Sequence, residues 1–149
     1  MLAAAVRPAH ADATAFIGTA TTPSNRSARG FAVGAGLVIV GFEFEYARIA
    51  ETPEDAAPGI KTGMGNVLLQ SPIAIFGMQP YATTGGGIYH EALGTTHSET
   101  NFGLNTGGGV KVSLLGPIRA RFDYRVLKLR GDALHSVVHR LYAGLNLKF

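Results

Sequence analysis

The sequence contains no cysteine among its 149 residues, which excludes disulfide frameworks and cysteine-ligated metals. Charged residues make up only 15% of the chain, whereas about a quarter is typical of globular domains. No apolar run approaches the roughly 18 residues of a transmembrane helix. A β-barrel needs no such run, because its strands satisfy each other's backbone groups. The residues therefore predict no transmembrane helix and leave a membrane barrel open.

The chain also has little of what nucleic-acid binding requires. The net charge is only +3, the basic residues do not cluster with aromatic residues on one element, and no nucleic-acid motif is present. The 20 glycines and the frequent apolar–polar alternation favour an all-β protein instead. On length alone we expect one domain.

The first residues have the features of an exported protein. Ala9-His10-Ala11 has the small-x-small form of a secretory cleavage site, although the apolar stretch before it is too short for a complete signal peptide. We therefore expect residues 1–11 to be the remnant of a signal peptide or a flexible start, and residues 12–149 to form a single β-barrel domain.

The segment 140–149 carries the clearest strand pattern. Leu141, Leu145, Leu147 and Phe149 fall on one face, and polar or small residues fall on the other. A period of two is typical of a strand, since successive side chains point to opposite sides. About 9–11 residues suffice for a transmembrane strand. The pattern therefore predicts a strand with one face against lipid.

Seven further segments alternate in the same way. Together with 140–149 they give eight predicted strands: 13–20, 30–40, 42–49, 60–70, 79–89, 101–114, 118–126 and 140–149. The connections after the first, third, fifth and seventh are predicted to be long and polar, and those after the second and sixth very short. The fourth connection, residues 71–78, is unusually apolar. Short turns at one end, long loops at the other and an even strand count are typical of outer-membrane barrels.

The order of these segments resembles the small eight-stranded outer-membrane β-barrels of the OmpA/OmpX type. Four motifs carry the resemblance: Pro80-Tyr81 leading into Gly85-Gly86-Gly87, then 107–110, 121–125 and the terminal Phe149. The resemblance implies an eight-stranded antiparallel up-and-down transmembrane barrel with both termini in the periplasm. It also implies that Phe149 is a signal for the barrel-assembly machinery. It fixes no activity, because one fold hosts many functions.

If the apolar faces meet lipid, the opposite faces meet in the lumen. A barrel of eight strands is just wide enough for side chains to fill it, so charges there must pair. We predict a charge network that plugs the lumen, with some basic charge in excess. Its predicted members are Glu43, Glu45, Lys111, Arg119, Arg121, Asp123, Arg125 and Lys148, accompanied by Asn66, Gln70 and Asn146.

Aromatic residues on the outward face are predicted near the strand ends. Phe31, Phe42, Phe102 and Phe149 would form an aromatic girdle at the membrane interfaces. In a soluble barrel the same residues would be core aromatics.

Histidines with acidic neighbours are the remaining candidates for chemistry. His90, His97, His135 and His139 accompany Glu91, Glu99 and Asp132, but their spacing matches no established metal motif, and we predict neither metal nor cofactor. His97-Ser98-Glu99 has the residue types of a lipid A deacylase of this fold. Its members are adjacent, whereas a catalytic pair on a strand needs the same face.

We therefore predict an outer-membrane barrel with a structural or surface-interaction role and no catalysis. Its partners would be the lipid bilayer with its lipopolysaccharide and the barrel-assembly machinery, and the chain would be a monomer. Three alternatives stay open: a soluble lipocalin-like barrel that binds a small ligand, a lipid A-modifying enzyme, and a narrow anion-preferring pore.

Overall fold

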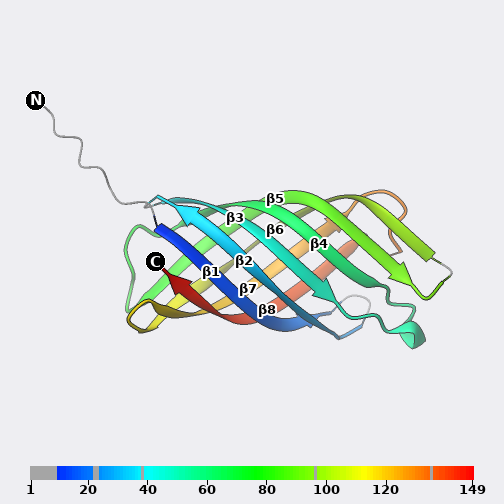
Figure 1. The fold of residues 1–149 in the computed structure, drawn as a ribbon, viewed down its shortest axis with the longest axis horizontal. Helices are drawn as coiled ribbons and strands as arrows, with labels where there is room; N and C mark the ends of the chain where they lie inside the picture. The colour runs from blue at the N-terminus through cyan, green and yellow to red at the C-terminus, as the bar shows by residue number, and fades with distance from the viewer. Residues whose placement is uncertain (1–9, 22–23, 38, 96, 135) are drawn as a thin grey trace, which may run out of the picture.

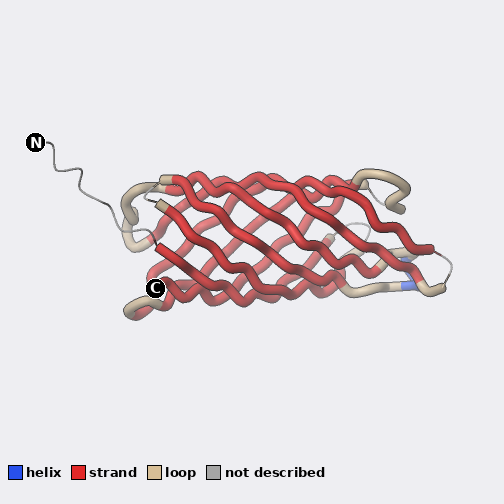
Figure 2. Tube along the Cα trace, turned by 45° about the horizontal axis from the view of Figure 1, so that its top comes forward, coloured by secondary structure: helices blue, strands red, loops and turns tan. Residues whose placement is uncertain are grey.

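The computed structural model describes residues 10–21, 24–37, 39–95, 97–134 and 136–149 and forms one closed antiparallel barrel (Figures 1 and 2). Each strand pairs with its chain neighbours, and β8 returns to β1. Among the described residues, no helix is long and apolar enough to cross a membrane. The strands are β1 His10–Ala20, β2 Arg26–Gly36, β3 Val40–Ile49, β4 Gly59–Gln70, β5 Met78–Leu93, β6 His97–Leu115, β7 Ile118–Leu129 and β8 Val137–Lys148, with a short 3-10 helix at Pro53–Asp55.

The barrel closes where β1 meets β8. Their register runs from Asp12 opposite Lys148 to Ala20 opposite Arg140, and the backbones of Ala11 and Phe149 exchange hydrogen bonds of 2.9 and 3.1 Å beyond it. His10 and Phe149 therefore lie at one end, called here the terminal end, and the β1–β2, β3–β4, β5–β6 and β7–β8 connections lie at the other, called the loop end (Figure 1). The predicted eight-stranded up-and-down barrel is confirmed.

Side chains alternate between an apolar outside and a polar inside. The outward-facing Ile17, Phe42 and Ile88 are 63–73% exposed, whereas the inward-facing Arg121 and Arg140 are fully buried. This is the reverse of a water-soluble protein, in which charged residues are almost never buried and large apolar residues form the core. The strands thus present a continuous apolar surface around a charged interior.

The strands are longer at the loop end than the sequence predicted. β2 begins at Arg26 rather than at residue 30, and β7 continues to Leu129 rather than ending at residue 126. The predicted polar loop over residues 90–100 is wrong, because β5 continues to Leu93 and β6 begins at His97. The apolar–polar alternation of the sequence stops where the apolar outer surface ends. The backbone hydrogen bonds between β5 and β6 continue beyond that point, as far as Leu93 and His97. The long loop expected after the fifth strand is therefore an extended hairpin.

The apolar connection between β4 and β5 forms a turn at the terminal end. The backbones of Ile75 and Met78 exchange hydrogen bonds of 2.8 and 3.0 Å, and Ser71 Oγ donates one of 2.6 Å to the Ile73 carbonyl. Phe76 has a left-handed φ of 52° and is 96% exposed at the tip. The turn therefore extends an apolar tip beyond the strand ends.

The filled lumen has two regions. An apolar cluster lies toward the loop end, because several of its members are the end residues of their strands; it comprises Ala20, Ala28, Ile49, Ile60, Met64, Tyr89, Leu127, Leu129 and Val138. Charged residues fill the middle of the lumen instead. Gly109 of β6 makes room there, since a Cβ at this position would lie 2.6 Å from the Tyr81 hydroxyl.

Candidate functional site

The alternation of β3, β7 and β8 places six charged side chains in the middle of the lumen. They form the central network, defined as Glu43, Glu45, Arg121, Asp123, Arg125 and Arg140. Residues two apart on a strand share a face, so Arg121, Asp123 and Arg125 of β7 all point inward. β3 supplies the two glutamates in the same way.

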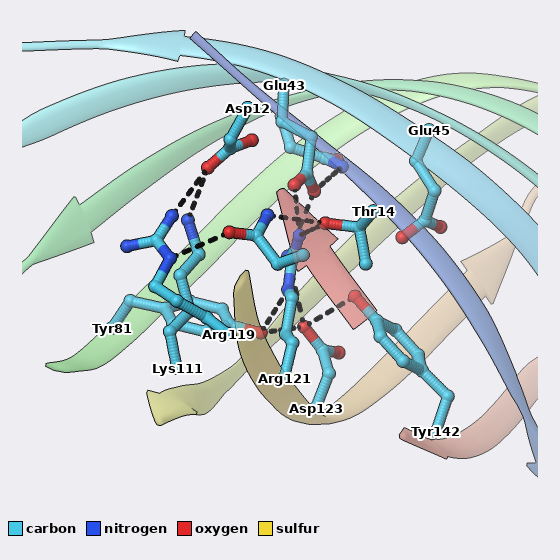
Figure 3. Close-up of polar contacts among 12 residues, drawn as sticks. Asp12, Thr14, Glu43, Glu45, Tyr81, Lys111, Arg119, Arg121, Asp123 and Tyr142 are labelled. Atoms are coloured by element: carbon cyan, nitrogen blue, oxygen red, sulfur yellow. Dashed lines mark hydrogen bonds and ion pairs between the residues drawn. The ribbon is translucent and has the colours of Figure 1, made fainter. Parts of the chain in front are cut away.

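Arg121 is at the centre of this network (Figure 3). Its Nη1 lies 2.5 Å from Glu43 Oε2 and 3.2 Å from Thr14 Oγ1, and its Nε donates to the Tyr81 hydroxyl at 2.9 Å. The guanidinium thus joins β1, β3, β5 and β7 across the lumen. Planar guanidinium groups suit such sites because their five donors can serve several acceptors at once.

Arg125 and Arg140 continue the network toward the loop end. Arg125 Nη1 lies 2.9 Å from Glu45 Oε2, and Arg125 Nε lies 2.9 Å from Asp123 Oδ1. Arg140 Nη2 lies 2.8 Å from Glu45 Oε1. Glu45 therefore bridges two arginines from adjacent strands, and each carboxylate of the central network contacts at least one guanidinium.

Two tyrosines complete the coordination of Asp123. Both the Tyr81 and the Tyr142 hydroxyls donate to Asp123 Oδ2, the latter at 3.0 Å. The Arg140 guanidinium lies 5.1 Å from the centre of the Tyr142 ring and 5.2 Å from that of the Phe16 ring. Aromatic faces attract cations at such distances, so the rings stabilise the arginines that have few hydrogen-bond partners.

A second charged group lies toward the terminal end. Lys111 Nζ and Arg119 Nη2 lie 2.8 and 3.2 Å from Asp12 Oδ2, and Arg119 Nε donates to Asn146 at 2.8 Å. This group adjoins a small pocket of about 170 Å³, which Lys148 also lines. Here basic residues exceed acidic ones, whereas the central network has three of each.

This arrangement closes the middle of the lumen. Moving a charge out of water costs several kcal/mol, which a partner of opposite charge and further hydrogen bonds offset. Arg121, Arg125 and Arg140 are 0–1% exposed, so water does not reach them. The central network therefore fills the middle of the lumen.

The structure brings most of the predicted network together and adds members that the sequence analysis missed. Ion pairs connect Glu43, Glu45, Arg121, Asp123 and Arg125. Lys111 and Arg119 belong to the terminal-end group, near Lys148. The missed members are Asp12, Thr14, Tyr81, Arg140 and Tyr142. Arg140 and Tyr142 lie an even number of positions from Asn146 and Lys148 on β8, so they share the inward face with them. The alternation of β8 could therefore have predicted both residues.

The four phenylalanines of the predicted girdle all face outward and are 49–71% exposed. Phe42 lies near the start of β3, and Phe149 follows β8 at the terminal end. Phe31 lies in the middle of β2, where its ring centre is 5.7 Å from that of Tyr46. Phe102 lies within β6 rather than at its end, because β6 extends to His97.

The structure separates the histidines. His90 contacts Thr100, and His139 contacts Tyr124 on the outside of the barrel, whereas His97 Nε2 lies 2.8 Å from the inward Glu91. His135 is outside the described residues. Within the part of the chain that is described, no three potential ligands gather to hold a metal ion. Ser98 alternates with His97 and Glu99 on β6, so the three do not share a face.

Comparisons with known proteins give matches in structure alone. No protein-family model matches the chain, and no curated protein matches it. The chain is similar to Neisserial surface protein A, with a TM-score of 0.73 and 16% identity over 95% of this chain and 97% of that one. It is similar to the N-terminal β-barrel domain of Pseudomonas aeruginosa OprF, with a TM-score of 0.70 and 13% identity over 94% and 97%.

A further match concerns an enzyme. The outer-membrane enzyme PagL gives a TM-score of 0.54 and 12% identity over 91% of this chain and 98% of PagL. At such low identities the likeness concerns the fold and leaves the activity open. Together with the closed barrel and its apolar exterior, the matches lead to one conclusion: this chain has the fold of the small eight-stranded β-barrels of bacterial outer membranes.

Proposed function

We propose that the chain is an outer-membrane barrel that presents its loop end at the cell surface and has a structural or surface-interaction role. The observation that carries the proposal is the apolar exterior around a closed, charged lumen. Large apolar side chains such as Ile17, Phe42 and Ile88 are mostly exposed, and in water such a surface would be an aggregation hazard. In a bilayer the same surface is the favourable one.

The same observation argues against the soluble alternative. A lipocalin-like barrel packs apolar side chains inward around its ligand and exposes its charges. Here Arg121 and Arg125 point inward, and Phe122 and Tyr124 between them point outward. The lumen is therefore the wrong environment for an apolar ligand.

Membrane fractionation and heat-modifiable gel migration test this proposal. We expect the protein in the outer-membrane fraction, with a folded band that migrates differently from the boiled one. Proteolysis of whole cells should cut first in the β3–β4 connection, where Pro53–Asp55 forms an exposed turn. A soluble protein whose migration does not change on heating would contradict the membrane location, and a protected β3–β4 connection would contradict the orientation.

The closed lumen predicts that the barrel conducts no ions. Planar-bilayer recordings of the purified protein should give no steady conductance at neutral pH. The anion-pore alternative requires a conductance that disappears or changes ion preference when Arg121 is replaced and the barrel stays folded. The basic excess at the terminal end, from Lys111, Arg119 and Lys148, is the feature that would favour such a path.

The similarity to PagL makes the enzyme alternative worth a direct test. Mass spectrometry of lipid A from cells that express the chain should give unchanged masses. A loss of one acyl chain, abolished by His97→Ala, would establish a hydrolase and overturn the proposed non-catalytic role. The division of His97 and Ser98 between two faces of β6 supports the unchanged result.

Recognition of Phe149 by the barrel-assembly machinery and a monomeric state complete the proposal. Replacing Phe149 by Ala should reduce the amount of folded barrel in the membrane without changing its melting temperature. Phe149 is 71% exposed, so its ring makes few contacts with the rest of the protein. Equal amounts of folded protein for the wild-type chain and the Phe149→Ala variant would refute the role of Phe149 in assembly.

A further inference from the structure

The charged side chains of the strands are sorted by sign between the two faces of the barrel wall. Every acidic residue of the described strands lies in an inward-facing position: Asp12, Glu43, Glu45, Glu91, Glu99 and Asp123. The outward-facing charges of these strands are all basic: Arg29, Arg48, Lys61 and Lys128. The outer wall therefore has a positive charge that the pairing inside the lumen does not require.

Three of these residues form a continuous row across neighbouring strands. Arg48 of β3 lies directly opposite Arg29 of β2 on one side and Lys61 of β4 on the other. All three are exposed, and none makes an ion pair within the described ranges. Like charges directly opposite each other on a sheet are destabilising. An anion that lies over the row would relieve this repulsion.

The row lies at the border of the apolar surface. Two positions closer to the middle of β2 and β3 lie Phe31 and Tyr46, whose rings are in contact. Toward the loop end, Arg48 is followed by the last residue of β3, and Lys61 is the third residue of β4. Basic residues at this depth meet lipid headgroups when the apolar surface lies in the hydrocarbon.

An apolar groove leads from the basic row down the outer wall. It has a volume of about 760 Å³ and extends from β8 across β1 and β2 to β3. Arg29 of β2 and Arg48 of β3 line it at the β3 side. Its lining includes the small residues Ala15 and Ala143 and the larger residues Ile17, Phe31 and Leu145. Small outward residues beside large ones leave a depression that suits an acyl chain.

We propose that the basic row and this groove, called here the lipid site, bind one molecule of lipid A, the phosphorylated, acylated part of lipopolysaccharide. The phosphates lie over Arg29, Arg48 and Lys61, and one acyl chain lies in the groove. Neighbouring strands are about 4.8 Å apart, so the row is about 10 Å long. A diester phospholipid with one phosphate neutralises only part of such a row, whereas a diphosphorylated glycolipid spans it. This inference rests on the proposed function as an outer-membrane barrel.

Lipid retention tests the lipid site. The protein is refolded into phosphatidylcholine vesicles that contain either diphosphoryl lipid A or phosphatidylglycerol of equal total charge, and bound lipid is counted by native mass spectrometry. The wild-type chain should retain one lipid A. Each basic residue near an anionic surface contributes about a fivefold gain in affinity, so the R29Q/R48Q/K61Q variant should bind lipid A on the order of 100-fold more weakly.

Two further variants distinguish the parts of the site. Lys128→Gln removes an exposed basic residue of β7 that pairs with Leu104 and Val137 and is outside the row, so the retention of lipid A should stay close to that of the wild-type chain. Ala143→Phe fills the groove on the lipid-facing side and should weaken retention while the basic row remains. A heat-modifiable band for every variant establishes that each is folded.

The outcomes separate the two proposals. A chain that never acquires protease protection in phosphatidylcholine vesicles contradicts the membrane location itself. A protected barrel that retains lipid A equally well as wild type and as R29Q/R48Q/K61Q overturns only the lipid site. Equal retention of phosphatidylglycerol and lipid A overturns the choice of a diphosphorylated ligand.

Discussion

The two regions of the lumen solve the problem of filling a narrow barrel in different ways. The apolar cluster near the loop end packs side chains such as Leu127 and Val138, whose contacts have no required direction. The central network holds Glu43, Arg121 and Asp123, which are stable there only with their specific partners. Apolar packing tolerates small changes, whereas a buried charge that loses its partner retains its full desolvation cost. We therefore expect larger losses of stability in the central network than in the apolar cluster, and the largest loss where a buried charge is reversed.

The largest effect is expected from Arg121→Glu. The change removes the guanidinium that contacts Glu43 and Asp123 and adds a third carboxylate beside them. Breaking a buried pair alone costs about 3–5 kcal/mol, and the added repulsion makes the loss larger. We expect no heat-modifiable folded band in refolding assays. Arg130→Glu, in the exposed β7–β8 connection, should refold normally. Normal refolding of Arg121→Glu would mean that the network is solvated.

Glu45→Gln should have the next largest effect. Glu45 bridges Arg125 and Arg140, and neutralising it leaves two buried guanidinium groups with less compensation. We expect a loss of about 3 kcal/mol in the free energy of unfolding, measured by urea titration in lipid vesicles. Combining it with Arg140→Met should recover part of the loss, with a coupling energy of about 2 kcal/mol. Additive losses in the double variant would contradict the pairing.

Leu127→Ala tests the apolar cluster at a fully buried position. Removing three carbons leaves a cavity beneath the loop end, and we expect a loss of about 2–3 kcal/mol with the barrel still folded. The same urea titration measures it, with Ala120→Gly on the outer face of β7 as a lipid-facing control. A loss as large as that for Arg121→Glu would remove the distinction between the two regions.

Ile60→Val should give the smallest effect. Ile60 lies at the edge of the apolar cluster, near the start of β4, and the change removes a single methyl group. We expect a loss of about 1 kcal/mol in the free energy of unfolding. A loss above about 3 kcal/mol would indicate that the apolar cluster is as sensitive to substitution as the central network.

The strand count, the inward face and most of the central network were predictable from the sequence, because a period of two assigns each side chain to one face. β7 is the clearest case, since Arg121, Asp123 and Arg125 alternate with Phe122 and Tyr124. The loop-end boundaries were not predictable, because above the apolar surface both faces of a strand are polar and the alternation disappears while the ladder continues. For this reason the sequence predicted a loop at His97 and Glu99, although both residues belong to β6.

The sequence also could not predict which charged residues of the lumen contact each other. Alternation says that Asp12 and Arg119 can both face inward, but their contact at 3.2 Å depends on the register around the whole barrel. The lipid site was missed for a similar reason. Arg29, Arg48 and Lys61 are far apart in the chain, and only the pairing of β2, β3 and β4 places them side by side.

The contacts of Arg121 also impose an order on folding. Its guanidinium contacts Thr14, 107 positions earlier in the chain, and Glu43, 78 positions earlier. Such distant contacts form slowly, because the loops between them must close first. A partly closed sheet in lipid would leave these charges facing hydrocarbon, which is costly. The inner charges should therefore stay hydrated until the last strands arrive, so closure of the barrel and loss of its internal water should be a single kinetic event.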